Sequence, residues 1–290
     1  MIESISWVVM ALISTACLAG MAEVNRYFKV EGFRLNFVRA AFAFLFLLPL
    51  YTQFYWPDER KFYLIILTAG LINVYAMTVF FDLAARYKTR ISSMYLSVAA
   101  LTAFGFWYLL HPDDFIALIN NTYLGPITIV SFLGVMAALQ FMRRNDYGFK
   151  TFMTILPIGV LFGVVDVFVK LFIENKYPVL GATLTFVTLS FWVTAIVSYL
   201  YLRHIKVPVS LDAPILKQGA ILGALSCGAF LSGTLAIVNA PNPAYPGVIA
   251  MSVPVLLLIH HKIFGVKDDG SILASVFMVA CIAALIYATI

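Results

Sequence analysis

The sequence predicts an all-α integral membrane protein with ten transmembrane helices. Of the 290 residues, 62% are hydrophobic and only 11% are charged, whereas a soluble domain is about half apolar and a quarter charged. The apolar residues form runs of about 17 to 25 residues, the length that crosses a bilayer as a helix. Alternation of period two is nowhere sustained, which argues against a membrane barrel. The first two observations exclude a water-soluble globule, and the third leaves helices as the spanning elements.

Polar residues, prolines and glycines divide the chain into the ten expected helices. In order along the chain they span about 5 to 24, 34 to 53, 62 to 85, 90 to 110, 123 to 142, 151 to 173, 179 to 202, 214 to 238, 243 to 262 and 271 to 289. Ten such helices take about 200 residues. No room remains for a soluble domain between them.

The first apolar run, Ile5 to Met21, follows a start that holds Glu3 and no Lys or Arg. A cleaved signal peptide has a basic start, so we expect this run to remain as the first span. The three cysteines, Cys17, Cys227 and Cys281, lie far apart inside apolar runs. We expect them to be buried free thiols because they form neither a CxxC pair nor a metal-ligand set.

The basic residues carry a topology signal. The net charge is +5, but Lys and Arg are scattered singly and form no patch for nucleic acid. Fifteen of the 19 fall in or beside the odd-numbered loops and four in the even-numbered ones. By the positive-inside rule the odd loops are cytoplasmic and both termini lie on the outer face. The expected location is the bacterial cytoplasmic membrane.

A weak internal repeat divides the chain into residues 1–145 and 146–290. Four short matches occur in the same order in both halves, at offsets that rise from 143 to 155: Gly20 to Val24 with Gly163 to Val167, Leu35 to Arg39 with Leu184 to Thr188, Leu83-Ala84 with Leu235-Ala236, and Ser97-Val98 with Ser252-Val253. Five spans in each half place the second half upside down. Inverted repeats are a transporter architecture with the substrate site near the midplane.

Three motifs carry a resemblance to a known family. They are Asn36-Phe-Val-Arg39-Ala-Ala41 at the start of span 2, Leu83 to Thr89 followed by Ile91-Ser-Ser93 between spans 3 and 4, and Ala236 to Tyr245 followed by Pro254-Val255 between spans 8 and 9. The sequence resembles the ten-span, EamA-like branch of the drug/metabolite transporter superfamily over essentially its whole length. It departs from that pattern at His111-Pro-Asp113-Asp114, where the family often has an acidic residue with a Gly-rich continuation.

The resemblance implies transport of small metabolites. In relatives, spans 1 to 4 and 6 to 9 enclose the cavity, and spans 5 and 10 lie at the periphery, where they could support a homodimer. The resemblance also adds Arg39, from the span 2 motif, to the candidate substrate-binding residues.

Asp166 is the strongest candidate for a site residue. It lies about four residues past the midpoint of span 6, about 6 Å from the bilayer centre. A carboxylate at this depth is costly unless it faces a polar cavity or a partner. Lys170 lies at i+4 on the same helix face, so two interpretations stay open. Either both residues bind substrate, or they neutralise each other and Lys170 extends to the interface.

Glu23 occupies the position of Asp166 in the first half, and Arg26 follows it by one helical turn. In an inverted pair the two acidic groups would approach one cavity from opposite sides, which suits a zwitterion or a proton relay. The alternative is that Glu23 ends span 1 at the interface and is solvated. Both interpretations of Glu23 stay open.

Neutral and aromatic candidates for substrate contact are Asn73 and Tyr75 in span 3, Tyr95 in span 4 and Trp192 in span 7. Asn73 is favoured, because a full amide in lipid needs partners. Most such residues serve packing and interhelical hydrogen bonds instead. Gly219 and Gly223 form a GxxxG pair that permits close helix packing. Pro157 and Pro254 interrupt spans 6 and 9, where a lost hydrogen bond permits a hinge.

The predicted function is that of a secondary transporter of a small polar or zwitterionic metabolite, such as an amino acid, working by alternating access. The expected partners are that metabolite, the bilayer and a coupling proton. No nucleotide-binding motif, HExxH or GxSxG is present, so no enzyme activity, cofactor or metal is expected. Adjacent His260 and His261 point about 100° apart, too little for a three-ligand site. The alternative is a membrane-embedded transferase or hydrolase, which needs acidic or His residues clustered at one membrane face.

Overall fold

The computed structural model describes residues 2–28, 30–86, 95–142, 149–174, 176–206, 212–266 and 270–290, and the regular structure in these ranges is helical throughout. The elements are α1 (Ile2–Phe28), α2 (Gly32–Leu47), η1 (Leu48–Gln53), α3 (Arg60–Arg86), α5 (Tyr95–Leu110), α6 (Pro112–Asn120), α7 (Leu124–Met142), α8 (Phe149–Ile173), α9 (Val179–His204), α10 (Ala213–Asn239), α11 (Ala244–Ala250), α12 (Val253–Ile263) and α13 (Ile272–Thr289).

Nine helical segments in the described ranges are long and apolar enough to cross a membrane. The remaining expected span, 90 to 110, corresponds to α5, a shorter apolar helix that begins at Tyr95. The start of that span lies outside the described residues. The chain is therefore an all-helical membrane protein, as the sequence predicts.

The structure differs from the expected helices at three places. Residues 112 to 120, expected as a polar loop, form α6. Pro112 fits the first helical position, and acidic side chains in the first turn favour the positive end of the helix dipole. Span 2 tightens into the 3₁₀ helix η1 at Leu48. Span 9 divides into α11 and α12 just before Pro254, which has no N–H for the preceding turn, whereas α8 continues through Pro157.

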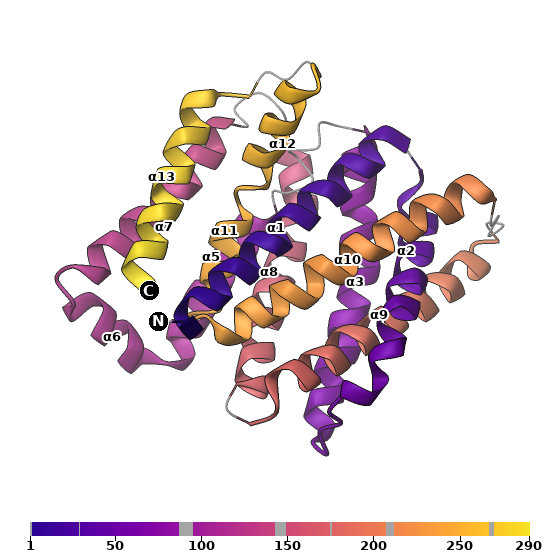
Figure 1. Ribbon diagram of the computed structural model, residues 1–290, viewed down its shortest axis with the longest axis horizontal. Helices are drawn as coiled ribbons and strands as arrows, with labels where there is room; N and C mark the ends of the chain where they lie inside the picture. The colour runs from indigo at the N-terminus through magenta and orange to yellow at the C-terminus, as the bar shows by residue number, and fades with distance from the viewer. Residues whose placement is uncertain are drawn as a thin grey trace.

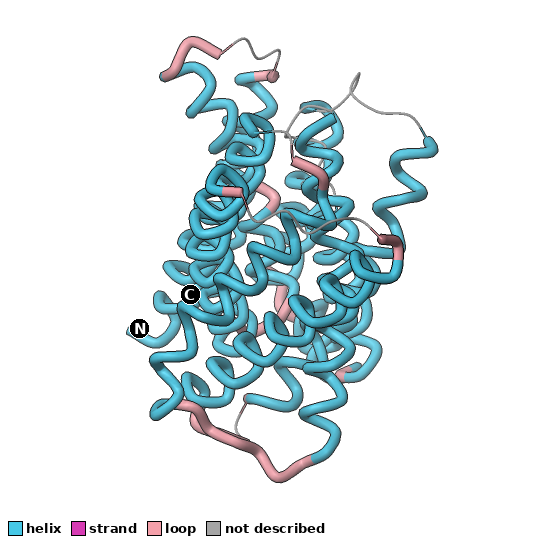
Figure 2. The backbone as a smooth tube through the Cα atoms, turned by 90° about the vertical axis from the view of Figure 1, so that its right-hand side faces the viewer, coloured by secondary structure: helices cyan, strands magenta, loops and turns pink. Residues whose placement is uncertain are grey.

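The helices form a single bundle in which α1 and α10 run side by side through the middle (Figure 1). The pair α7 and α13 lies at one edge of this view, whereas α2, α3 and α9 pack together on the other side. Helix α8 packs against α5 and α3, and α11 and α12 pack against α1. The side view in Figure 2 shows that both ends of the chain lie on the same side of the bundle.

Small residues let α10 approach α2 closely. A Cβ added to Gly223 would lie 2.7 Å from the Cβ of Phe42, and one added to Gly219 would lie still closer to Val38. The predicted role of this GxxxG pair in helix packing is confirmed. The three cysteines are free, with Cys281 buried and the other two half-buried.

Candidate substrate cavity

A cavity lies in the centre of the bundle, with a volume of about 140 Å³ in which the centre of a water molecule can move. Helices of both halves form its walls: α1, α3 and α5 from the first half, and α8, α9, α10 and α11 from the second. The described residues that line it are Ser14, Leu18, Ala69, Asn73, Tyr95, Leu96, Ala99, Phe162, Val165, Asp166, Val169, Phe186, Val187, Ser190, Phe191, Ala229, Phe230, Gly233, Thr234, Ile237 and Gly247.

Asp166 is the only charged side chain among these lining residues. It shares the cavity face of α8 with Phe162, Val165 and Val169, which follow the three- and four-residue spacing of one helix face. The carboxylate makes no hydrogen bond or ion pair with any described residue. The structure therefore places Asp166 at the cavity without a partner among the described residues.

Lys170 lies one turn beyond Asp166 but is not a lining residue. Its ammonium is buried and donates to Glu174 Oε1 at 2.8 Å, to the Val238 carbonyl at 3.0 Å and to the Ala240 carbonyl at 2.7 Å. An ammonium has three N–H donors, so this set uses all of them. The interpretation in which Lys170 neutralises Asp166 is thus not what the structure shows. Lys170 instead satisfies carbonyls at the end of α10, where a cation is favoured.

Two polar side chains face the cavity with unsatisfied oxygen atoms. The amide of Asn73 on α3 is 3% exposed, and its Oδ1 has no described hydrogen-bond partner. Ser190 Oγ on α9 is likewise buried and unpartnered. Ser14 on α1 donates to the Ala229 carbonyl at 2.8 Å, so its oxygen can only accept another hydrogen bond. A ligand in the cavity can satisfy these groups.

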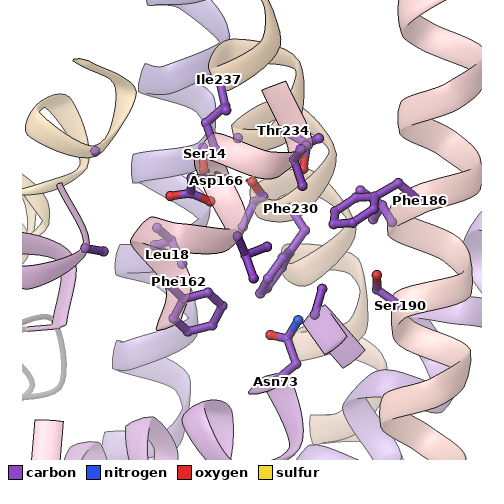
Figure 3. A pocket seen from close by; sticks show the side chains of 18 of the residues that line it. Ser14, Leu18, Asn73, Phe162, Asp166, Phe186, Ser190, Phe230, Thr234 and Ile237 are labelled. Carbon is purple, nitrogen blue, oxygen red and sulfur yellow. Dashed lines mark hydrogen bonds between the residues drawn. The ribbon is translucent and has the colours of Figure 1, made fainter. Parts of the chain in front are cut away.

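Aromatic rings form much of the remaining wall, as Figure 3 shows for Phe162, Phe186 and Phe230. Tyr95 packs on Phe162 with ring centroids 5.4 Å apart. In this view Asp166 lies toward one end and Asn73 toward the other, with the Phe162 and Phe230 rings between them. Sequence reasoning missed these phenylalanines, because a Phe that faces a cavity and one that faces lipid look alike in a sequence.

Arg39 lies behind this aromatic wall and is fully buried. Its guanidinium donates to Asn36 Oδ1 through Nε and Nη2 and to Ser226 Oγ through Nη1. The guanidinium carbon is 5.4 Å from the centre of the Phe191 ring and 5.7 Å from that of Phe230. Arg39 therefore supports the wall and does not face the cavity.

Tyr75 and Trp192 do not reach the cavity. Their side chains are 49% and 47% exposed on the outer surface of the bundle. Trp192 borders a surface groove with Phe44 and Trp56. A membrane-facing position explains both residues.

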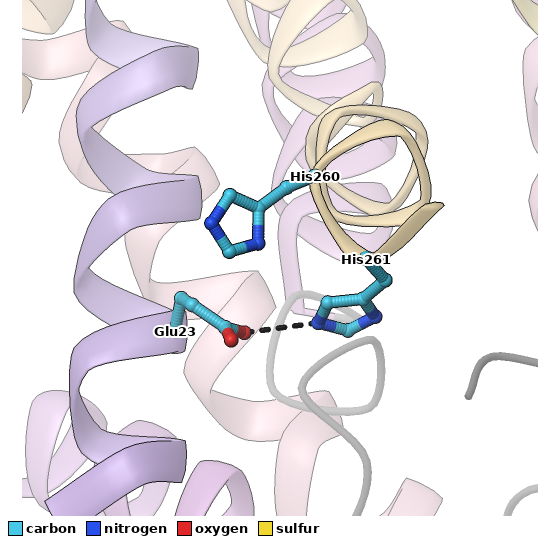
Figure 4. A group of neighbouring side chains, drawn as sticks. All are labelled: Glu23, His260 and His261. Atoms are coloured by element: carbon cyan, nitrogen blue, oxygen red, sulfur yellow. Dashed lines mark hydrogen bonds and ion pairs between the residues drawn. The ribbon is translucent and has the colours of Figure 1, made fainter. Parts of the chain in front are cut away.

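Glu23 belongs to a different cluster, at the end of α1. Its carboxylate forms an ion pair with Arg26 and accepts a hydrogen bond from His261 Nε2 at 3.1 Å if that nitrogen is protonated. His260 also turns toward it, and one ligand atom from each of Glu23, His260 and His261 lies within 4.8 Å of the others (Figure 4). The structure thus does not bring Glu23 to the cavity beside Asp166.

This cluster corrects the expectation that the histidines lack a third ligand. Glu23 comes from α1 and the two histidines from α12, so their meeting depends on how helices far apart in the sequence pack together. However, the Glu23 carboxylate already has Arg26 and His261 as partners. Glu23 is thus paired without a metal ion, whereas the buried Nδ1 atom of His260 has no hydrogen-bond partner among the described residues.

Comparisons with known proteins identify the fold alone. No family model matches the sequence, and no curated protein matches it. A solved structure described only as "Crystal structure of protein" is 14% identical, with a TM-score of 0.69, and the match covers 98% of this chain and 96% of that one. The fold and the cavity thus define a helical membrane protein with a buried central site.

Proposed function

We propose that the protein is a secondary transporter of a small metabolite that carries an amino group, working by alternating access. The observation that carries this proposal is Asp166, a carboxylate without a described partner, in a central cavity enclosed by helices of both halves. An ionisable group inside a membrane is costly and is usually kept for a substrate or a proton. The protein would act as an exporter, an importer or an exchanger of this metabolite.

The pairing of helices supports an inverted repeat. Exchanging the halves pairs α1 with α8, α2 with α9, α3 with α10, α5 with the α11–α12 segment, and α7 with α13. Under this exchange the contact of α1 with α10 becomes that of α8 with α3, and the contact of α5 with α8 becomes that of α11 and α12 with α1. The contacts α2–α9 and α7–α13 map onto themselves. A pseudo-two-fold axis between two five-helix units accounts for this pattern.

The same pattern supports membership of the EamA-like branch of the drug/metabolite transporter superfamily, which the span 2 motif and the hinge motifs suggest. We place the protein in the bacterial cytoplasmic membrane on the Lys and Arg distribution. Since no ATP-binding motif occurs in the sequence, an ion or substrate gradient would drive the transport, with a proton at Asp166 as one coupling ion. The peripheral pair α7 and α13 is the proposed homodimer surface.

Two features beside the cavity suit a moving gate. The break between α11 and α12 removes regular helix hydrogen bonds beside the cavity residue Gly247. At the other side of the hinge, Lys170 of α8 holds the carbonyl groups of Val238 and Ala240. Helices α11 and α12 can therefore tilt at the break while α8 and the end of α10 stay joined.

The alternative of a membrane-embedded transferase or hydrolase draws its support from the Glu23, His260 and His261 cluster, which does lie at one end of the bundle. Glu23 is paired with Arg26 and His261, whereas Asp166 has no described partner. The transporter is favoured, because an unsatisfied buried carboxylate needs an external cation more than a paired one does.

Flux into proteoliposomes tests the proposal. Purified protein is reconstituted, and uptake of a radiolabelled panel of amines and amino acids is measured for wild type, for Asp166→Asn and for the matched control Asp113→Asn on exposed helix α6. We expect saturable flux in wild type and control, and its loss in Asp166→Asn with unchanged thermal unfolding. Unchanged flux in the Asp166→Asn protein would contradict the proposal.

A further inference from the structure

The described residues that line the cavity carry a net negative charge. Asp166 contributes one negative charge, and the described lining residues contribute no positive charge. A ligand with an ammonium group can balance this carboxylate. A ligand with a carboxylate would bring a second negative charge into a low-dielectric space, where repulsion is far stronger than in water.

Lys170 and Arg39 could in principle balance a substrate carboxylate, but both already bind other groups of the protein. Lys170 uses its three N–H groups on Glu174 and two backbone carbonyls. Arg39 donates to Asn36 and Ser226, and its guanidinium lies over the rings of Phe191 and Phe230. Recruiting either one to a substrate carboxylate would leave buried acceptors unsatisfied. The zwitterion pocket that the sequence suggests, with a cation facing an acid, is therefore not assembled here.

The walls suit the body of an organic amine. Rings of Tyr95, Phe162 and Phe230 face the cavity, and aromatic faces attract cations and apolar groups alike. The accepting oxygen of Ser14 suits the N–H donors of a primary or secondary ammonium. Each feature favours a cationic donor attached to an apolar skeleton.

We propose that the cavity selects small organic amines that have an apolar or aromatic body and no carboxylate. This inference rests on the proposed transport function and names its substrate class. It rejects free amino acids, which the sequence alone favoured, because their carboxylate meets no positive charge among the described lining residues.

A matched set of probes tests the selection on the whole protein. Phenethylamine, phenylalanine and 3-phenylpropionate share one skeleton and differ in charge. Isoamylamine, leucine and 4-methylpentanoate repeat the comparison without a ring. Binding is measured by titration calorimetry on detergent-purified wild type, Asp166→Asn, Phe162→Leu and the control Phe141→Leu, whose ring is exposed on α7.

We expect each amine to bind at least about tenfold more tightly than its amino acid, since an unpaired buried carboxylate costs more than 1.4 kcal/mol. The acids should not bind. Asp166→Asn should abolish amine binding with unchanged thermal unfolding, and Phe162→Leu should weaken phenethylamine about three- to tenfold, the range of one cation–π contact. Phe141→Leu should bind as wild type.

Amino acids that bind as tightly as their amines would overturn the inference and leave the proposed transport function intact. Binding of none of the six probes would also overturn it, because the cavity would then not accept the class named. The transport function is judged separately by the proteoliposome flux of the wider panel. Amine binding that survives in Asp166→Asn would overturn both the inference and the role of Asp166.

Discussion

Replacing Lys170 by Met tests the assignment of this buried ammonium to the end of α10. Its side chain is 1% exposed, and it donates to the Val238 and Ala240 carbonyls and to Glu174. Methionine has a similar length and cannot donate. The change therefore leaves two carbonyls unsatisfied with little change in packing.

The magnitude follows from these contacts. A hydrogen bond from a charged group contributes about 1.5 to 3 kcal/mol, and breaking a buried charged set costs about 3 to 5 kcal/mol. Glu174 is 36% exposed and can be hydrated after the change, so the two carbonyls dominate. We expect Lys170→Met to lower the free energy of unfolding by about 3 to 5 kcal/mol, whereas Asp166→Asn leaves it nearly unchanged.

Chemical denaturation in mixed micelles, followed by circular dichroism, gives the required free energies for both single variants and the double variant. Since Lys170 and Asp166 are not paired in the structure, their effects should add to within about 0.5 kcal/mol. Recovery of wild-type stability in the double variant would refute the assignment, because it would mean that the two side chains neutralise each other.

The remaining predictions concern packing, the Glu23 cluster and topology. Gly223→Val should destabilise the protein by about 1 to 3 kcal/mol, because its side chain would overlap α2. The control Gly105→Ala should not, since no atom lies within 4 Å of the added Cβ. Equal melting temperatures of the two variants would contradict this prediction. Glu23→Gln and His261→Gln should show a coupling energy of about 1 kcal/mol in a double-mutant cycle, and metal analysis of the purified protein should find no stoichiometric zinc. A periplasm-active reporter fused after Ile290 should be active, and activity of a cytoplasm-only reporter there would reverse the predicted orientation.

Much of the fold could be predicted from the sequence, because transmembrane helices are a local property. A run of about 20 apolar residues must satisfy its own backbone hydrogen bonds in lipid, and a helix does so without a partner. The depth of Asp166 follows from its place in such a run. The break near Pro254 was also expected, since the missing N–H is a local feature.

The partners of each polar side chain depended on the tertiary structure. Lys170 is one turn from Asp166 in sequence, yet its ammonium reaches Val238 and Ala240 of another helix. Glu23 meets His261 across 238 positions. Helix periodicity specifies which residues lie on the same face of a helix. The direction in which that face points, and the helices it contacts, depend on the packing of all the helices.

The sequence by itself determined that the chain is a helical membrane protein and that Asp166 lies at membrane depth. Both conclusions follow from the length of the apolar runs and from the position of the charged residue within one of them. Only the tertiary structure decided that Asp166 faces a cavity walled by Phe162 and Phe230, whereas Tyr75 and Trp192 face outward. A phenylalanine is hydrophobic in either place, so its identity does not distinguish a position in lipid from one in a cavity wall. Distinguishing the two therefore requires the positions of the surrounding helices.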